Sequence, residues 1–306
     1  TRIILSGLSI ITFSGCALGL LLPYNPSLPT PWYRPLSSMI GYTYFISWSV
    51  SFYPQLITNY ERKSVEGVSV DSYVLAVVNY TCYSIYNGYF YFNEGIRKEY
   101  RERNGDNAEI TVQSNDVAFA VNALFVTILG LGQIVYYGGM KEGSVSSMTK
   151  IITLCVCLMS GVYIACIHMY DWALWIDFLY MMATIKLVLS VLTYLPQLIL
   201  NYQRRSTEGW NLWSPVLDFT GGVLSLVQLV GDSVDLKEGM QGILGNWAKF
   251  VLSLLTLGFD TAFFLQHIMY NHDDSYEDET GDIEETEETY SLLEEDREGE
   301  SESAVV

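Results

Sequence analysis

Residues 54–67 read PQLITNYERKSVEG and residues 196–209 read PQLILNYQRRSTEG, and this repeated stretch decides the fold. Ten of the fourteen positions are identical, at an offset of 142 residues. Two unrelated apolar helices do not share a matched Pro-Gln, Asn-Tyr and Ser-x-Glu-Gly by chance. A second correspondence pairs Asp116-Val-Ala-Phe with Asp260-Thr-Ala-Phe, at an offset of 144 residues. We therefore predict a unit of three helices that the chain uses twice.

Long apolar runs place these helices in a membrane. Half of the 306 residues are apolar and 16% are charged, whereas about a quarter are charged in an ordinary soluble protein. A helix that spans a bilayer needs about 20 mostly apolar residues. Runs of this kind cover 38–60, 70–93, 116–137, 148–168, 172–203, 211–231 and 246–270. Buried helices of a soluble protein would need far more polar surface around them, so we predict an all-α, polytopic membrane protein.

The predicted architecture is a seven-helix bundle with a 3+1+3 arrangement. Residues 38–137 and 172–270 would form the two three-helix repeats, and residues 138–171 would form an unpaired linker helix. A single linker helix keeps the two copies in the same orientation, which is the parallel kind of transporter repeat. Such repeats place the substrate site at the interface between the copies.

The two ends of the chain differ from this bundle. Residues 1–37 combine an apolar run with a linker that contains five prolines, and the run fits a secretory signal and an extra membrane helix equally well. Residues 271–306 carry 16 acids and one base, so this segment holds most of the net charge of −18. A segment with so many acids and so few apolar residues is predicted to be disordered.

Composition and spacing also exclude several classes of function. The chain has no basic face that could neutralise phosphates, so we expect no binding of nucleic acid. Its five cysteines lie inside apolar runs and not in the pattern of a disulfide scaffold. No nucleophile–base pair or metal-ligand spacing occurs at membrane depth. We therefore expect neither an enzyme nor a bound metal or cofactor.

The repeated motif predicts a pair of hinges. Proline lacks an amide donor and clashes with the preceding helical turn, so Pro54 and Pro196 should kink their helices. Gln55 and Gln197 could bind the carbonyl groups that the prolines leave unpaired, because such groups are costly in lipid. A single proline is more simply a static kink, but two at equivalent positions favour moving hinges. Asn201, on the same face as Gln197, offers its amide to a pore or a partner helix.

The chain resembles the PQ-loop family of membrane transporters, and within it the cystinosin branch of lysosomal cystine–proton symporters. Besides the repeated motif, the resemblance rests on residues 47–55 (SWSVSFYPQ), 217–222 (LDFTGG) and 259–267 (FDTAFFLQH). It covers about residues 38–270. It implies the export of L-cystine, or a related amino acid, from the lumen of a lysosome or vacuole, coupled to protons.

Ionisable residues at membrane depth are rare, and each is a hypothesis of function. Asp218 lies in the sixth predicted span, where loss of hydration favours its protonated form. It could therefore take up a proton from an acidic lumen and release it to the neutral cytosol. Asp260 and Asp116 rank second as proton carriers, and Asp116 fits an N-cap equally well. Lys186, the one lysine deep in the predicted bundle, could bind a substrate carboxylate or form a structural ion pair with Asp218.

The predicted substrate-binding residues are Lys186, Asn201, Asn79, Asp218, Ser214 and Thr193. The resemblance implies that Asn79 contacts the substrate, whereas an interhelical hydrogen bond is its alternative role. Two positions depart from the pattern, because cystinosins commonly have a lysine at the place of Thr193 and an asparagine at the place of Ser214. Both positions border the substrate cavity in the family. A cationic amino acid is therefore the alternative substrate.

The acidic tail contains a candidate sorting signal. Glu288, Tyr290, Leu292 and Leu293 read both as a tyrosine-based signal and as an acidic dileucine signal, which clathrin adaptors bind in the cytosol. The tail would then be cytosolic, and the residue-37 end of the bundle would face the lumen of a lysosome or vacuole. The expected partners are the amino acid, protons, membrane lipid and the adaptors. A membrane sorting receptor without transport activity is the alternative from another class.

Overall fold

The chain is built almost entirely of helices in a computed structural model that describes residues 2–104, 112, 114–138, 144–170, 173–237, 239, 240, 243 and 249–270. These residues form α-helices and one short π-helix, with no strand among them. The elements are α1 (Arg2–Leu21), α2 (Tyr33–Val50), α3 (Tyr53–Arg62), α4 (Val70–Phe92), α5 (Glu94–Asn104), α6 (Ser114–Gln133), η1 (Ile134–Gly138), α7 (Ser147–Met169), α8 (Trp175–Arg204), α9 (Trp213–Asp235) and a last described helix, Lys249–Tyr270.

Five of the described helices are long and apolar enough to cross a membrane. They are α6 with η1, then α7, α8, α9 and the last helix, Lys249–Tyr270. The prediction of an all-α, polytopic membrane protein is thus confirmed. Helices α2, α3 and α4 occupy the first two predicted spans but fall outside these five, so the count of seven spans stays a prediction.

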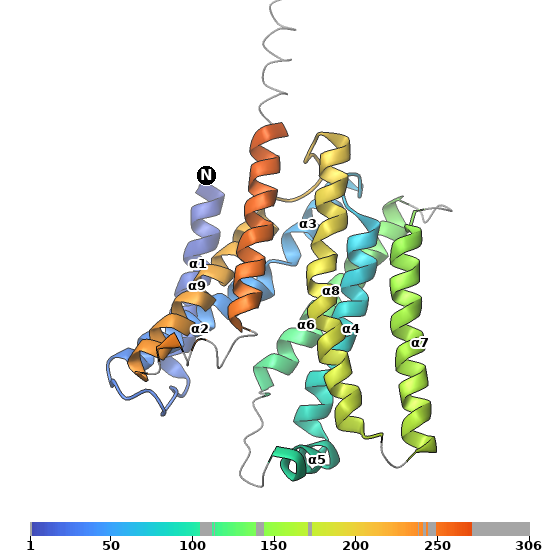
Figure 1. Cartoon of the computed structure of the whole chain (residues 1–306). Helices are drawn as coiled ribbons and strands as arrows, with labels where there is room; N and C mark the ends of the chain where they lie inside the picture. The colour runs from blue at the N-terminus through green and yellow to red at the C-terminus, as the bar shows by residue number, and fades with distance from the viewer. Residues whose placement is uncertain are drawn as a thin grey trace, which may run out of the picture.

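The arrangement brings the two repeats together along their length. Helix α4 packs against α8 and α6, and α2 packs against α9 and α1. The loops after α3 and α8 lie at the same end of the bundle as the end of the last helix, whereas the Pro-rich linker and α5 lie at the other end (Figure 1). This is the orientation that parallel repeats predict. Helix α7, the predicted linker, stands at the edge and exposes most of its apolar side chains.

The two prolines of the repeated motif act differently on their helices. Pro54 lies in the first turn of α3, and the helical run breaks at Ser51 and Phe52, between α2 and α3. Proline is well accommodated at such a helix start because its missing amide has no partner to lose there. Pro196 lies inside α8, which runs on from Trp175 to Arg204. The predicted first span is therefore two helices, and only this repeat has a break.

Helix α5 follows α4 almost directly and lies between the predicted spans 70–93 and 116–137, where no helix was predicted from the sequence. It lacks an apolar repeat, and its side chains form ion pairs one turn apart, from Arg97 to Glu94 and from Lys98 to Glu102. It also docks on the start of α8, where Arg103 pairs with Asp177. That hydrogen bond raises the pKa of the Arg103 guanidinium above its ordinary value. Tertiary contacts that the sequence pattern does not reveal therefore support this helix.

Helix α1 packs closely against α2 through two glycines. A Cβ atom at Gly15 would lie 2.5 Å from Thr43 Cα, and one at Gly19 would lie 2.4 Å from Met39 Cα. Small residues allow two membrane helices to approach this closely. The described apolar part of α1, Gly7–Leu21, is shorter than the five candidate spans, and the choice between a secretory signal and an extra membrane helix stays a prediction.

A larger side chain at this contact is expected to separate the two helices. Gly15→Leu should lower the melting temperature of the purified protein in detergent, because the new side chain meets the backbone of α2. Gly7→Leu is the matched control, since a Cβ atom there meets nothing within 4 Å. Equal melting temperatures for the two variants would contradict the close packing.

Candidate functional site

A cavity of about 910 Å³ lies between the two repeats. Its lining begins at Pro23 and Asp232, at the end of the bundle that carries the Pro-rich linker, and reaches Gln55 and Gln197 of the repeated motif. Aromatic side chains form much of its wall, from α2, α4, α8 and the last helix. The interface between the repeats is therefore hollow, as the 3+1+3 arrangement predicts.

Most of the predicted site residues line this cavity. These are Asp116, Asp218, Asp260, Lys186, Asn79, Thr193, Ser214, Gln55 and Gln197. Pro54, Pro196 and Asn201 are not part of the lining. Asn201 is fully buried, accepts a hydrogen bond from Gln197 and donates one to Gln266. The amide of Asn201 thus binds Gln197 in its own helix and Gln266 in the last helix, as the partner-helix alternative predicts, and its role in substrate binding stays a prediction.

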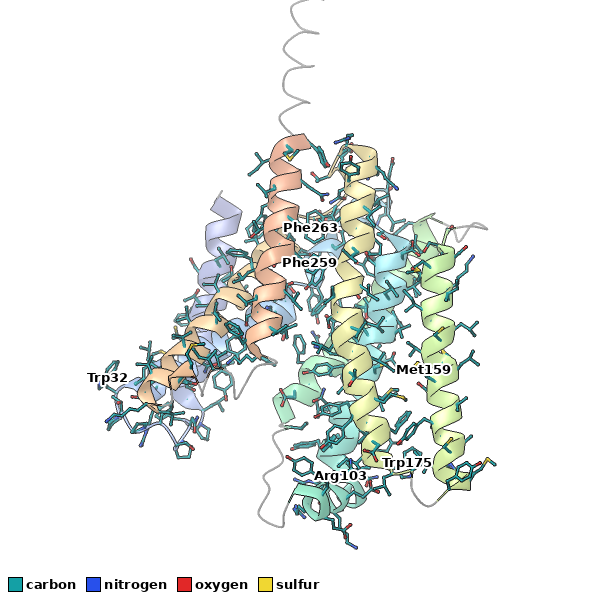
Figure 2. The ribbon with its side chains drawn as sticks, viewed as in Figure 1. Trp32, Arg103, Met159, Trp175, Phe259 and Phe263 are labelled. Atoms are coloured by element: carbon teal, nitrogen blue, oxygen red, sulfur yellow. The ribbon has the colours of Figure 1, made fainter. Side chains whose placement is uncertain are left out.

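Asp218 is held by an aromatic wall. The hydroxyl of Tyr194 donates to Asp218 Oδ2 at 2.8 Å, and Trp48 Nε1 donates to the backbone oxygen of Asp218 at 3.1 Å. The Tyr194 ring stacks on Phe259 with centroids 4.9 Å apart. Figure 2 shows Phe259 and Phe263 between the last helix and α8. Tyr194 of α8 thus holds the carboxyl group of Asp218 and Trp48 of α2 holds its backbone, while Asp218 remains part of the cavity lining.

Four polar atoms of the lining residues have no partner among the described residues. They are Ser72 Oγ, Asn79 Oδ1, Ser214 Oγ and Asp260 Oδ2, all of them buried. Asp260 is 1% exposed, so water does not solvate it from outside. Buried polar atoms are normally paired, and an unpaired one is costly. A bound ligand or a proton would satisfy these atoms, which marks this part of the cavity as a candidate binding site.

Lys186 approaches an aromatic ring instead of an acid. Its Nζ lies 4.7 Å from the centre of the Tyr83 ring. The described residues contain five ion pairs, and Lys186 takes part in none of them. The structural ion pair with Asp218 is therefore not formed in this state. A cation–π contact stabilises the charge only partly, so the ammonium group is available to an anionic ligand.

Sequence reasoning missed a second lysine, Lys249. It lines the same cavity from the start of the last helix, donates to Gln228 Oε1 at 2.7 Å and lies 4.8 Å from the centre of the Tyr44 ring. It lies near the edge of the predicted span 246–270, and no role was predicted for it from the sequence. A helical wheel would have found it, because Lys249 and Asp260 are eleven residues apart, which is about three turns of a helix.

The two glutamines of the repeated motif bind across the repeats. Gln55 donates to the backbone oxygen of Gly209 at 3.0 Å and accepts from the backbone nitrogen of Asn211 at 2.7 Å. Gln197 donates to the backbone oxygen of Gly67 and accepts from the backbone nitrogen of Ser69, both at 2.8 Å. The prediction that they satisfy carbonyls freed by their own prolines is wrong. Each one fixes the loop of the other repeat.

We call this arrangement the PQ-loop clasp, formed by Gln55 and Gln197 with loops 63–69 and 205–211. The loops touch so closely that a Cβ atom at Gly209 would lie 1.8 Å from the Glu66 backbone oxygen. Reciprocal ion pairs join Arg62 to Glu208 at 3.3 Å and Arg204 to Glu66 at 3.6 Å. Both acids are exposed, so each pair contributes at most about 1 kcal/mol. Backbone contact and the buried glutamines therefore hold the clasp more than the charges do.

The hydrogen bonds around the clasp correct the register of the repeat. Asn59 donates to Gln133 Oε1 at 3.0 Å, and Asn201 donates to Gln266 Oε1 at 3.2 Å. Gln133 and Gln266 are thus equivalent, at an offset of 133 residues. The match of Asp116 with Asp260 at an offset of 144 is therefore wrong.

This register changes which residue of the other repeat is equivalent to Asp260 and which is equivalent to Asp116. Thr127 is the equivalent of Asp260, and Lys249 is the equivalent of Asp116. The cavity therefore carries an acid from one repeat and a base from the other at symmetric positions.

The candidate sorting signal, at Glu288, Tyr290, Leu292 and Leu293, lies outside the described residues.

Comparison with known proteins agrees with this geometry. A family model described as "PQ loop repeat" matches residues 36–96 and 178–237. Cystinosin from Drosophila melanogaster is 37% identical over 77% of this chain, which spans 59% of that protein's length. A cystinosin homolog from Dictyostelium discoideum is 34% identical over 78% of this chain and 82% of its own length. A cystine transporter from Saccharomyces cerevisiae is 24% identical over 77% of this chain and 94% of its own length.

The name of the Saccharomyces protein describes transport, and none of these names describes catalysis, which agrees with the prediction that the chain is not an enzyme. The resemblance read from the repeated motif is confirmed as well. The two PQ-loop matches coincide with the helices that form the clasp and much of the cavity wall. This chain belongs to the PQ-loop family and, within it, to the cystinosins.

Proposed function

We propose that this chain is a proton-coupled symporter that carries L-cystine from the lumen of a lysosome or vacuole to the cytosol. The observation that carries the proposal is the cavity, which brings Lys186, Asp218 and Asp260 together between two repeats that are clasped at one end. The names of the relatives, which include a cystine transporter, support the choice of substrate.

The chemistry of the cavity suits an amino acid. Cystine has a carboxylate and an ammonium group at each end, joined by an apolar disulfide. Lys186 can bind a carboxylate, and the unpaired Asn79 Oδ1 can accept from an ammonium group. The aromatic wall, with Phe52, Tyr80 and Trp210, can cover the apolar middle. Sites of this kind combine an apolar wall with a few convergent polar groups.

Proton coupling would come from the buried acids. Protonation of Asp218 removes a charge next to Tyr194, whose hydroxyl donates to the carboxylate in this state. The neutral acid makes the cavity less anionic and so favours a substrate that carries two carboxylates. Release of the proton on the cytosolic side would then favour release of the substrate. Asp260 and Asp116 would assist as secondary proton carriers along the same cavity.

Alternating access would come from the clasp and the break before Pro54. The cavity reaches the Pro-rich linker at one end and stops at Gln55 and Gln197 at the other. With the tail in the cytosol, the state described here is loaded from the lumen and closed toward the cytosol. Opening on the cytosolic side requires the clasp to separate, with Pro54 and Pro196 as hinges. The tail signal would route the protein to the lysosome or vacuole through clathrin adaptors.

Flux measurements test the proposal. Protein sent to the plasma membrane would present its luminal side to the medium, and we expect uptake of radiolabelled L-cystine to be much faster at an external pH of about 5 than at about 7. A gradient of two pH units provides roughly 2.7 kcal/mol for each coupled proton. The same cells without the protein serve as the control. No uptake at either pH would contradict transport of cystine, and it would favour a sorting receptor.

A cationic amino acid is the second candidate substrate, and Thr193 favours it. Thr193 lines the cavity, and its hydroxyl donates to the backbone oxygen of Leu189 at 2.7 Å, so it adds no positive charge. Four acids of the lining, Asp116, Asp218, Asp232 and Asp260, face the same space. Competition of unlabelled L-arginine and L-lysine against labelled L-cystine separates the two substrates. We expect L-cystine to compete best; stronger competition by arginine would identify a cationic exporter.

A further inference from the structure

Two lysines line the cavity, and they reach it from different helices. Lys186 comes from the middle of α8 and Lys249 from the start of the last helix. Each ammonium group lies over a tyrosine ring, Tyr83 for Lys186 and Tyr44 for Lys249. Neither forms an ion pair in the described part of the chain, and the lining contains no arginine. The cavity thus holds two cations without an ion pair in the described residues, and Asp232 acts on Lys249 only from a longer distance.

The position of Lys249 is fixed by a chain of polar groups. Its Nζ donates to Gln228 Oε1 at 2.7 Å, and Gln228 Nε2 donates to the backbone oxygen of Ser37 at 2.8 Å. The hydroxyl of Ser37 donates to Asp232 Oδ1 at 2.7 Å. An ammonium group has three N–H donors and no acceptor. Gln228 takes one of them, so the group is held in place while donors remain for a ligand.

A charged lysine that is away from water destabilises the protein unless an anionic group or hydrogen-bond acceptors pair with its ammonium group. Lys186 and Lys249 reach the cavity from different helices and lie over different rings, so each can meet a separate group of a ligand. A substrate with one carboxylate offers a single anionic group to the two cations. A substrate with a carboxylate at each end would match both, and cystine is such a molecule.

We propose that Lys249 is a specificity-determining residue that binds the second carboxylate of a two-ended substrate, while Lys186 binds the first. This inference rests on the proposed function and extends it, because it explains selection of a dicarboxylate over an ordinary amino acid. Gln228 is then a positioning residue, since it holds Lys249 through its side-chain oxygen.

A pair of substrates that differ by one carboxylate tests the inference. L-cystine has two, and the mixed disulfide of L-cysteine and cysteamine has one. In Lys249→Gln, we expect the KM for L-cystine to rise about ten- to a hundredfold, because a charge-assisted contact is lost. The KM for the mixed disulfide should change less than about threefold, because Lys186 still binds its single carboxylate. Lys249→Arg, which keeps the charge, should restore most of the affinity for L-cystine.

Two results would overturn the inference. One is an unchanged KM for L-cystine in Lys249→Gln, and the other is an equal rise for both substrates. Absence of cystine transport by the unmutated protein would instead remove the proposed function itself, so the two failures are distinguishable.

The unmutated protein offers a second measurement that does not depend on folding of a variant. Reaction of Lys249 with an amine-selective acetylating reagent, followed by mass spectrometry, should be slowed by saturating L-cystine. It should not be slowed by cystamine, which has the same disulfide and two ammonium groups but no carboxylate. Equal rates with and without L-cystine would contradict binding at Lys249.

Discussion

Asp218→Asn is expected to abolish accumulation of L-cystine against a gradient. An amide has nearly the shape of a carboxyl group but cannot take up and release a proton. The unmutated protein, under a gradient of two pH units, can sustain about a hundredfold accumulation for one coupled proton. Without the proton, the accumulation ratio should fall to about one, while exchange of cystine across the membrane continues. The measurement is the steady-state ratio of radiolabelled L-cystine inside and outside proteoliposomes.

A matched control separates this effect from a general loss of acid. Asp177 lies at the start of α8, pairs with Arg103 and is not part of the cavity lining. Asp177→Asn should therefore retain accumulation, although it removes an acid from the same repeat. If Asp218→Asn accumulates L-cystine as well as the unmutated protein does, another group carries the proton. Asp260→Asn and Asp116→Asn would then be the next variants to compare.

Gly209→Ala is expected to break the PQ-loop clasp and to reduce the stability of the protein more than other glycine substitutions. Gly209 has a φ of 85°, a conformation that costs an L-residue about 1–2 kcal/mol. Its new methyl group would also overlap the Glu66 backbone oxygen, which lies 1.8 Å from the Cβ position. Backbone cannot move aside as a flexible side chain can. The loops must therefore separate, and the hydrogen bonds of Gln55 to Gly209 and Asn211 are lost.

Two measurements test this variant: its melting temperature in detergent, and how readily a reagent reaches the cavity from the cytosolic side. We expect a clearly lower melting temperature for Gly209→Ala, and faster reaction of a cysteine placed at Thr193 with a thiol reagent added from the cytosolic side. Gly161→Ala, in α7, is the control because a Cβ atom there meets nothing within 4 Å. If Gly209→Ala has the same melting temperature and the same rate of thiol reaction as this control, the clasp does not close the cavity.

The sequence predicted the helices well where apolar runs are long. The boundaries of α7 and α8 lie within a few residues of the predicted 148–168 and 172–203. The break before Pro54 was predicted as a kink, yet the identical motif at Pro196 continues as one helix. A proline sets a local preference, and packing against neighbours decides whether the helix breaks. Helix α5 was missed because charged pairs and docking on α8 stabilise it, and neither leaves an apolar pattern.

The candidate site could be predicted only in part, for a related reason. Asp218 and Lys186 stand out because charges are rare in apolar runs, and both do line the cavity. Lys249 was missed because it lies near the end of a run, where a lysine is ordinary. The role of Gln55 and Gln197 was missed because their partners are backbone groups about 150 and 130 residues away in the sequence. Contacts of this kind depend on how the two repeats meet, which no local pattern records.

Simultaneous recording of proton and cystine movement tests the central claim most directly. Proteoliposomes of the unmutated protein, loaded with a pH-sensitive dye and placed in acidic medium, should acidify faster when L-cystine is added outside, and labelled L-cystine should enter at a rate proportional to that acidification. Entry of L-cystine without any change in internal pH, at a rate that is the same with and without the gradient, would contradict the account.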